Sequence, residues 1–332
     1  MTRIRTALLG TVLVALLAAC ASTPPKPDPE PTTPVPVVTD DQVATIMASL
    51  DDTLAAADAN LDGDALSARL EGPALDVRRA DYVVAAAGHE LPAMTIERDE
   101  RWTVVSQTST WPRVVLVATK QPTNLVGTAR ILVLRQDSPR DPYRLWGSAG
   151  LGSAMVTPEL TDPRWGSSAL PLDDTKLVMK PSDVLPQYAD VLKNGDSSEH
   201  AAAFVGTDQD GMRAGIEAIR AKINAKKGDA GEYTETFDAP EDPAVVLATA
   251  DGGALVVGRL TTTAEVKGID VGGAAADDPM MVRVAALAGG TLTSSMTWTY
   301  TDVVVFKVPP STSPGPVVVV AYAHTVTSAA SS

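Results

Sequence analysis

The stretch 297-TWTYTDVVVFKV-308 decides the fold, because threonine, valine and aromatic residues continue through it without a glycine or a proline. This composition favours a long β-strand over a helix. Successive side chains in a strand point to opposite faces, so every second residue shares a face. One face then carries Trp298, Tyr300, Asp302, Val304 and Phe306. We expect this aromatic face to be the inner one, which points Asp302 into the concave side of a curved sheet.

Asp302 is therefore a candidate general base. A carboxyl group in an apolar pocket has a raised pKa and can exchange protons with a substrate. The returning strand after the turn 309–316 carries Tyr322 and His324 on one face, and Tyr300 or His324 would orient the substrate. A one-residue slip in register would send His324 to the opposite side. The alternative is a structural acid, or a strand that bulges near Asp302 and exposes it.

Further strands and helices are predicted on both sides of this stretch. Capping residues followed by apolar positions three and four apart predict helices, and runs rich in Val, Leu and Thr between turn residues predict antiparallel strands. The expected helices span 39–57, 64–70, 73–88, 182–192, 199–204 and 212–226. The expected strands span 102–107, 113–120, 128–136, 142–147, 232–237, 244–250, 254–264, 281–286, 293–308 and 317–327.

The two halves of the chain share landmarks in the same order, which indicates a tandem duplication. Two unrelated α+β domains of similar composition are the alternative. The matched landmarks are Asp62-Gly63-Asp64 with Asn194-Gly195-Asp196, Gly72 and Arg79-Ala80 with Gly206 and Arg213-Ala214, and Pro112-Arg113-Val114-Val115-Leu116 with Pro243-Ala244-Val245-Val246-Leu247.

Helices followed by a meander of long strands resemble the nuclear-transport-factor-2-like, or cystatin-like, cone, in which a curved sheet wraps a helix. The chain looks like a bacterial lipoprotein with two such domains of unknown function. The resemblance implies an α+β fold with a first domain at 39–156, a linker at 157–175 and a second domain at 176–332. Each domain would pack N-terminal helices on a curved antiparallel sheet. It implies no single activity, because one fold hosts many functions.

The N-terminus has the order of a secretory signal peptide at 1–19: Arg3 and Arg5, then an apolar run, then small residues. Leu17-Ala18-Ala19-Cys20 resembles the lipobox of bacterial lipoproteins, in which the cysteine receives diacylglycerol and a fatty acyl chain such as palmitate. An ordinary signal with a chance cysteine is the alternative. Residues 20–38 are rich in proline and predict an extended tether that reaches roughly 50–60 Å at about 3.1 Å per residue.

The charge and the cysteine content of the chain limit the kinds of partner that we expect it to bind. The 332 residues carry a net charge of -14, which argues against nucleic acid and against electrostatic attachment to anionic lipid. Loss of Arg3 and Arg5 with the signal leaves a side-chain charge of -16, so membrane attachment should depend on the lipid at Cys20. The single cysteine excludes an internal disulfide and a multi-cysteine metal cluster.

The best metal-like motif starts at Asp58 and continues through Asn60 and Asp62 to Gly63, like the first half of a calcium-binding loop. Arg69 occupies the twelfth position, where a bidentate acid should close the loop, so we reject the calcium site in favour of a turn between helices. Motifs for nucleophilic catalysis, nucleotides and zinc proteases are missing from the sequence, and we expect no cofactor and no metal.

These features predict a lipid-anchored protein on the extracytoplasmic face of the cell membrane. Its expected role is that of a non-catalytic binding or scaffolding module for an envelope protein, an envelope polymer or a small apolar ligand. The alternative is a small isomerase-like or dehydratase-like enzyme that uses Asp302. A third hypothesis is that the first domain is an accessory to a cell-wall synthase.

Overall fold

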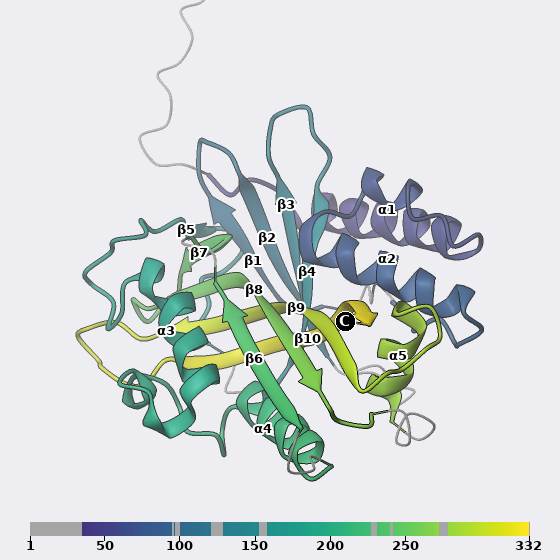
Figure 1. The fold of residues 1–332 in the computed structure, drawn as a ribbon. Helices are drawn as coiled ribbons and strands as arrows, with labels where there is room; N and C mark the ends of the chain where they lie inside the picture. The colour runs from purple at the N-terminus through teal and green to yellow at the C-terminus, as the bar shows by residue number, and fades with distance from the viewer. Residues whose placement is uncertain are drawn as a thin grey trace, which may run out of the picture. The chain divides into compact units, whose positions relative to one another are not determined.

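Two series of helices followed by strands succeed one another along the chain (Figure 1). The computed structural model describes residues 35–94, 96, 100–120, 129–152, 158–226, 231–239, 242–271 and 278–331. The predicted signal peptide, Cys20 and the tether up to residue 34 lie outside the described residues.

The first series begins with a helix whose start and buried face match the prediction. Thr39 caps α1 in a capping box, in which its side chain accepts from Gln42 and the Gln42 side chain accepts from the Thr39 amide. The predicted helix at 64–70 is a single short 3₁₀ turn. The elements are α1 (Asp40–Asp58), η1 (Ala65–Ala68), α2 (Gly72–Ala86), β1 (Glu100–Gln107), β2 (Arg113–Thr119), β3 (Arg130–Gln136) and β4 (Arg144–Leu151).

The second series comprises β5 (Ser167–Ser168), α3 (Pro181–Asn194), η2 (Gly195–Ser197), η3 (Ala201–Ala203), α4 (Gly211–Asn224), β6 (Glu232–Asp238), β7 (Val245–Ala248), β8 (Ala254–Lys267), α5 (Pro279–Leu287), β9 (Ser295–Val308) and β10 (Val318–Ser331). It differs from the first in that the short strand β5 precedes its helices, helix α5 lies between two of its strands, and β8, β9 and β10 have 14 residues each.

The strand predicted at 281–286 is wrong, because these residues belong to helix α5. Asp278 caps this helix by accepting from the amide of Met280, and Pro279 stands in the first turn, where its missing N–H costs nothing. A six-residue apolar run is too short for its period to separate a strand from a helix.

One sheet connects the two series. Its strand order is β5-β1-β2-β3-β4-β10-β9-β8-β6, and β7 pairs with β8 beside this path. The two meanders join where β4 pairs with the start of β10, through Leu151 and Ala321. At the far edges, Ser167 pairs with Ser106 of β1, and Ala169 forms a bridge to Leu247 of β7. The sheet therefore curls until its two outer edges approach the same short segment.

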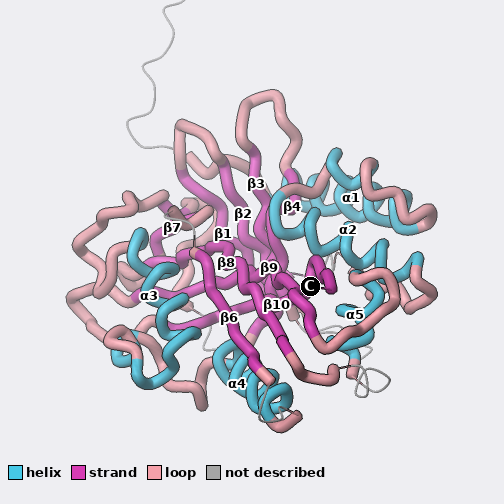
Figure 2. The backbone as a smooth tube through the Cα atoms, viewed as in Figure 1, coloured by secondary structure: helices cyan, strands magenta, loops and turns pink. Residues whose placement is uncertain are grey.

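The helices cover the outside of this curled sheet, as Figure 2 shows. Alternate residues of the strands face two layers: Val115 of β2 packs under α1 and α2, whereas its neighbour Leu116 faces the opposing strands. Val303 and Val305 of β9 enter that inner layer, while Phe306 faces α3 and α4. The core therefore has an inner layer made almost entirely by strands and outer layers made by strands and helices.

The α+β class is confirmed. The predicted linker at 157–175 contributes strand β5, and Val35–Ser332 form one compact unit that contains both predicted domains. The two halves thus share one sheet. A cone-like arrangement within each half stays a prediction.

Candidate functional site

Asp302 and His324 lie directly opposite each other in the β9–β10 pair, in the register that the sequence analysis required. His324 Nδ1 is 2.7 Å from Asp302 Oδ1, and Thr262 of β8 donates its hydroxyl to Asp302 Oδ2 at 2.6 Å. The Asp302 side chain is completely buried and that of His324 is 11% exposed. The Asp302 carboxylate therefore has a polar partner on each oxygen and fixes the orientation of the imidazole.

Tyr300 joins the same cluster. Its ring stacks on the ring of His324, with 3.8 Å between the centroids and 11° between the planes. The indole of Trp298 donates to the Tyr300 hydroxyl at 2.9 Å, and that hydroxyl donates to the sulfur of Met280 in α5 at 3.0 Å. Burial raises the pKa of Tyr300 further above its usual value near 10. The three predicted site residues thus come together in space.

The cluster is packed rather than open. Neither pocket described below is lined by Asp302, Tyr300 or His324, and Asp302 has no contact with solvent. An acid that is buried and hydrogen-bonded on both oxygens serves as a structural link between β8, β9 and β10 as it stands. Two neighbours of the cluster line cavities: Met280, which accepts from Tyr300, and Tyr233, whose ring stacks on that of Trp298.

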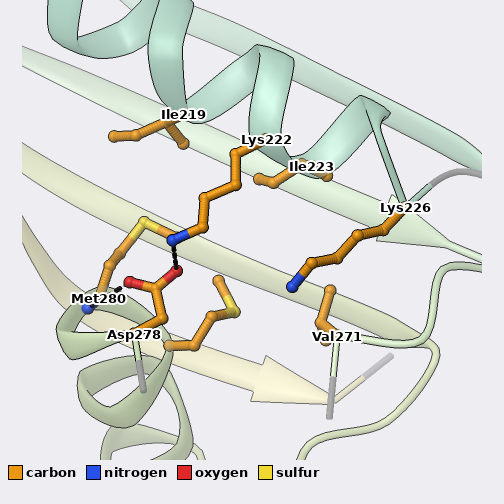
Figure 3. A pocket seen from close by; sticks show the side chains of 8 residues that line it. Ile219, Lys222, Ile223, Lys226, Val271, Asp278 and Met280 are labelled. Carbon is orange, nitrogen blue, oxygen red and sulfur yellow. Dashed lines mark hydrogen bonds and ion pairs between the residues drawn. The ribbon is translucent and has the colours of Figure 1, made fainter. Parts of the chain in front are cut away.

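The cavity lined by Met280 lies between the end of α4 and the start of α5 (Figure 3) and has a volume of about 80 Å³. Two isoleucines, one valine and two methionines supply its apolar walls, and two lysines and one aspartate complete the lining. The lining residues are Ile219, Lys222, Ile223, Lys226, Val271, Asp278, Met280 and Met281.

The two lysines of the pocket differ in their pairing. Lys222 Nζ binds Asp278 Oδ2 at 2.8 Å, and the other oxygen of Asp278 caps α5. Burial would raise the pKa of Asp278, but the hydrogen bonds from Lys222 and from the Met280 amide outweigh it and lower that pKa. Figure 3 shows the Lys226 side chain extending toward the other lining residues, with no interaction marked between it and them. Within the described ranges, Lys226 Nζ has no ion pair.

Sequence reasoning missed this pocket. It assigned 281–286 to a strand, which places Met281 on a sheet rather than on a helix beside α4. The dipeptide Asp278-Pro279, a cap followed by a proline in the first helical turn, is the signal that could have found α5.

A second, polar pocket of about 190 Å³ lies beside α4 and β6. Its acid, Glu235, accepts from Arg220 at 2.7 Å and from the Tyr233 hydroxyl at 2.6 Å, while Lys193 and Asn224 complete the lining. Burial raises the pKa of Tyr233. Three of the five lining residues, Arg220, Tyr233 and Glu235, are thus paired with one another.

Two acidic residues of the calcium-like loop form hydrogen bonds and ion pairs with other protein groups. Asp58 binds Arg78 with both oxygens and accepts from the Tyr82 hydroxyl, and Asp62 accepts from two amides of the following turn. In the part of the chain that the structure describes, no three His, Cys, Asp or Glu side chains are grouped to hold a metal ion. No helix there is long and apolar enough to cross a membrane.

The fold and these sites define an α+β protein with a helix-covered, curled sheet and a small apolar pocket. The chain belongs to the DUF8094 family, a domain of unknown function whose model matches residues 34–331. Neither a curated protein nor a solved structure matches it.

Proposed function

We propose that this protein is a non-catalytic binding module that is anchored by lipid to the extracytoplasmic face of the cell membrane and takes a small apolar ligand. The pocket between α4 and α5 carries the proposal. Its walls come from side chains that pack well against hydrocarbon, and methionine in particular adapts its shape to a ligand. At roughly 10–15 Å³ of cavity for each water molecule, the pocket of about 80 Å³ holds about six waters, so only a small ligand fits.

The binding test uses the chain from residue 21 onward, which keeps the whole compact unit Val35–Ser332. Methionine Cε methyls are labelled with ¹³C, and the signals of Met280 and Met281 are assigned with the M280L and M281L variants. 1-Hexanol titrated into the protein should shift these two signals in a saturable manner. Met47, which lies on the buried face of α1, should not move and serves as the internal control. Unchanged Met280 and Met281 signals would contradict the proposal.

The anchor rests on the order of Arg3, the apolar run and Cys20 in the sequence. Metabolic labelling with an alkyne palmitate analogue in a bacterial host should label the wild-type chain and leave Cys20→Ser unlabelled. Because Cys20 is the only cysteine of the sequence, the variant has no other thiol that could carry the label as a thioester. Equal labelling of both chains, or of neither, would contradict lipidation at Cys20.

A small isomerase-like or dehydratase-like enzyme is the second candidate, and the contacts of His324 with Asp302 and with Tyr300 favour it. In this function a ligand must contact His324, whose side chain is 11% exposed. The same titration, followed on ¹⁵N-labelled histidines, tests that requirement, since His89 and His200 are the only other histidines. A His324 signal that stays fixed while Met280 shifts would rule against catalysis by this cluster.

We also propose that each half is a cone-like unit and that the halves arose by duplication. The ion pairs Asp64–Arg79 and Asp196–Arg213 support this, because both join positions that match between the halves. The match between 112–116 and 243–247 does not, because the former lies in inner strand β2 and the latter in β7 beside β8. Superposition of β1–β4 on β6, β8, β9 and β10 in chain order tests the proposal, and the lack of a common register would oppose it.

A further inference from the structure

Lys226 gives the pocket a local charge opposite to that of the chain. Lys222 and Asp278 neutralise each other, which leaves the ammonium of Lys226 as the excess charge among the described lining residues. The whole chain carries -14. A cationic spot at the mouth of an apolar pocket on an acidic protein attracts a negatively charged group to that mouth.

The apolar contacts and the charged contact of the pocket come from different residues. The side chains of Ile219, Ile223 and Met281 form apolar wall, whereas the Lys226 side chain is exposed and can keep its ammonium in contact with solvent while its aliphatic part lines the pocket. A ligand that fits both would have an apolar chain inside and one anionic group outside. A single ammonium matches a single negative charge.

We propose that the ligand of this pocket is a short-chain carboxylate, with its hydrocarbon chain between α4 and α5 and its carboxylate at Lys226. This inference rests on the proposed binding function and specifies its ligand class. Asp278 weakens the binding of the carboxylate, because it pairs with Lys222 and places a negative charge next to the carboxylate group of the ligand.

Two variants test the headgroup contact in opposite directions. Lys226→Gln removes the free cation. Asp278→Asn removes the competing anion and releases Lys222, while asparagine still caps α5. Lys180→Gln removes an equally positive, exposed side chain at the start of α3 and is the matched control.

Dissociation constants for sodium hexanoate and for neutral 1-hexanol are measured from the Met280 and Met281 methyl signals. Lys226→Gln should raise the constant for hexanoate about threefold to fivefold, as expected for an exposed ion pair. The constant for hexanol should change less than about twofold. Asp278→Asn should lower the hexanoate constant, Lys180→Gln should leave both constants unchanged, and added salt should weaken hexanoate binding only.

The outcomes separate the two proposals. If both probes bind and Lys226→Gln affects them equally or not at all, the carboxylate ligand is overturned and the apolar binding function stands. If neither probe shifts the methionine signals of the wild-type protein, both are overturned. A selective loss of hexanoate binding in Lys226→Gln together with a gain in Asp278→Asn supports the ligand class.

Discussion

Arg283 of α5 forms an ion pair with Asp81 of α2, with 2.7 Å between Nη1 and Oδ1, although the two residues are 202 positions apart. Asp81 also binds Arg78 at 3.3 Å, and Arg283 donates to the carbonyl of Val326 in β10 at 2.6 Å. The Asp81 and Arg78 side chains are 6% and 1% exposed. A buried network thus connects a helix of the first half to a helix and a strand of the second.

Asp81→Ala should destabilise the protein strongly, because it leaves two largely buried guanidinium groups without this carboxylate. Loss of one partner from a buried ion pair costs about 3–5 kcal/mol. Asp137→Ala, which removes the more exposed pair with Arg135, should cost less than about 1 kcal/mol. Urea denaturation of the two variants measures both costs. Equal unfolding midpoints of the two variants would show that the buried network adds no more stability than a surface ion pair.

The two halves should unfold together. Continuity of the sheet through β4 and β10, and the contacts of Asp81 with Arg283 and of Asp76 with Arg259, couple them. Differential scanning calorimetry should therefore record one transition whose calorimetric and van't Hoff enthalpies agree. Two resolved transitions would mean that the halves fold as separate domains.

Gly258→Ala should destabilise β8. A Cβ at this position would enter the Leu185 side chain of α3, with Leu185 Cδ2 only 2.8 Å away. Overpacking of this kind costs about 1–3 kcal/mol. Adding Leu185→Ala to Gly258→Ala should relieve the clash. The double variant should therefore be at least about 1 kcal/mol more stable than the sum of the losses of the two single variants predicts. Additive losses would argue against the contact.

Gly215→Ala is the control for that substitution. Gly215 lies in α4, where an added Cβ meets no atom within 4 Å. Alanine should therefore stabilise the helix by about 0.5–1 kcal/mol. Urea denaturation that showed a loss here would point to a general cost of replacing glycine rather than to Leu185.

Asp210 should make stability depend on pH. It caps α4 through the amides of Met212 and Arg213, and Tyr188 donates to it at 2.9 Å. Burial nevertheless raises its pKa above the usual 3.8. The folded state then binds more protons than the unfolded state in the interval between the two pKa values, so the contribution of Asp210 to stability falls as pH rises through that interval.

Asp210→Asn keeps the cap and removes the ionisation. The unfolding free energy of wild type minus that of the variant, compared at about pH 3, 5 and 7, should therefore fall from the lowest to the highest pH and rise at no step. Urea denaturation at the three pH values measures this difference. An increase with pH would mean that the folded state favours the charged carboxylate.

Local patterns predicted much of the fold because single residues determine them. Thr39 and Gln42 form the capping box of α1, and the spacing of Val43, Met47 and Leu50 predicted its buried face. Alternation along β9 predicted that Trp298 and Asp302 share a buried face. The expectation that this face is the inner, concave one was wrong, because it packs against α3, α4 and α5 while Val303 and Val305 face the inner layer. The same reasoning placed His324 across from Asp302 only conditionally, because register depends on pairing between strands and not on either strand alone.

The pocket and the single curled sheet could not be predicted in this way. Both depend on contacts between distant segments: Met280 meets Tyr300 only after α5 packs against β9, and β4 meets β10 only after both meanders form. The short run 281–286 also carried too few residues to reveal its helical period. Long-range packing, rather than local preference, therefore determines where this protein has a cavity.

Intermolecular nuclear Overhauser effects give the most direct test of the binding function. With 1-hexanol bound, the Met280 and Met281 methyls should show cross-peaks to the hydrocarbon protons of the ligand, and the Met47 methyl should show none. This pattern would place the ligand between α4 and α5. Cross-peaks to Met47 alone, or no cross-peaks at saturating hexanol, would contradict the account.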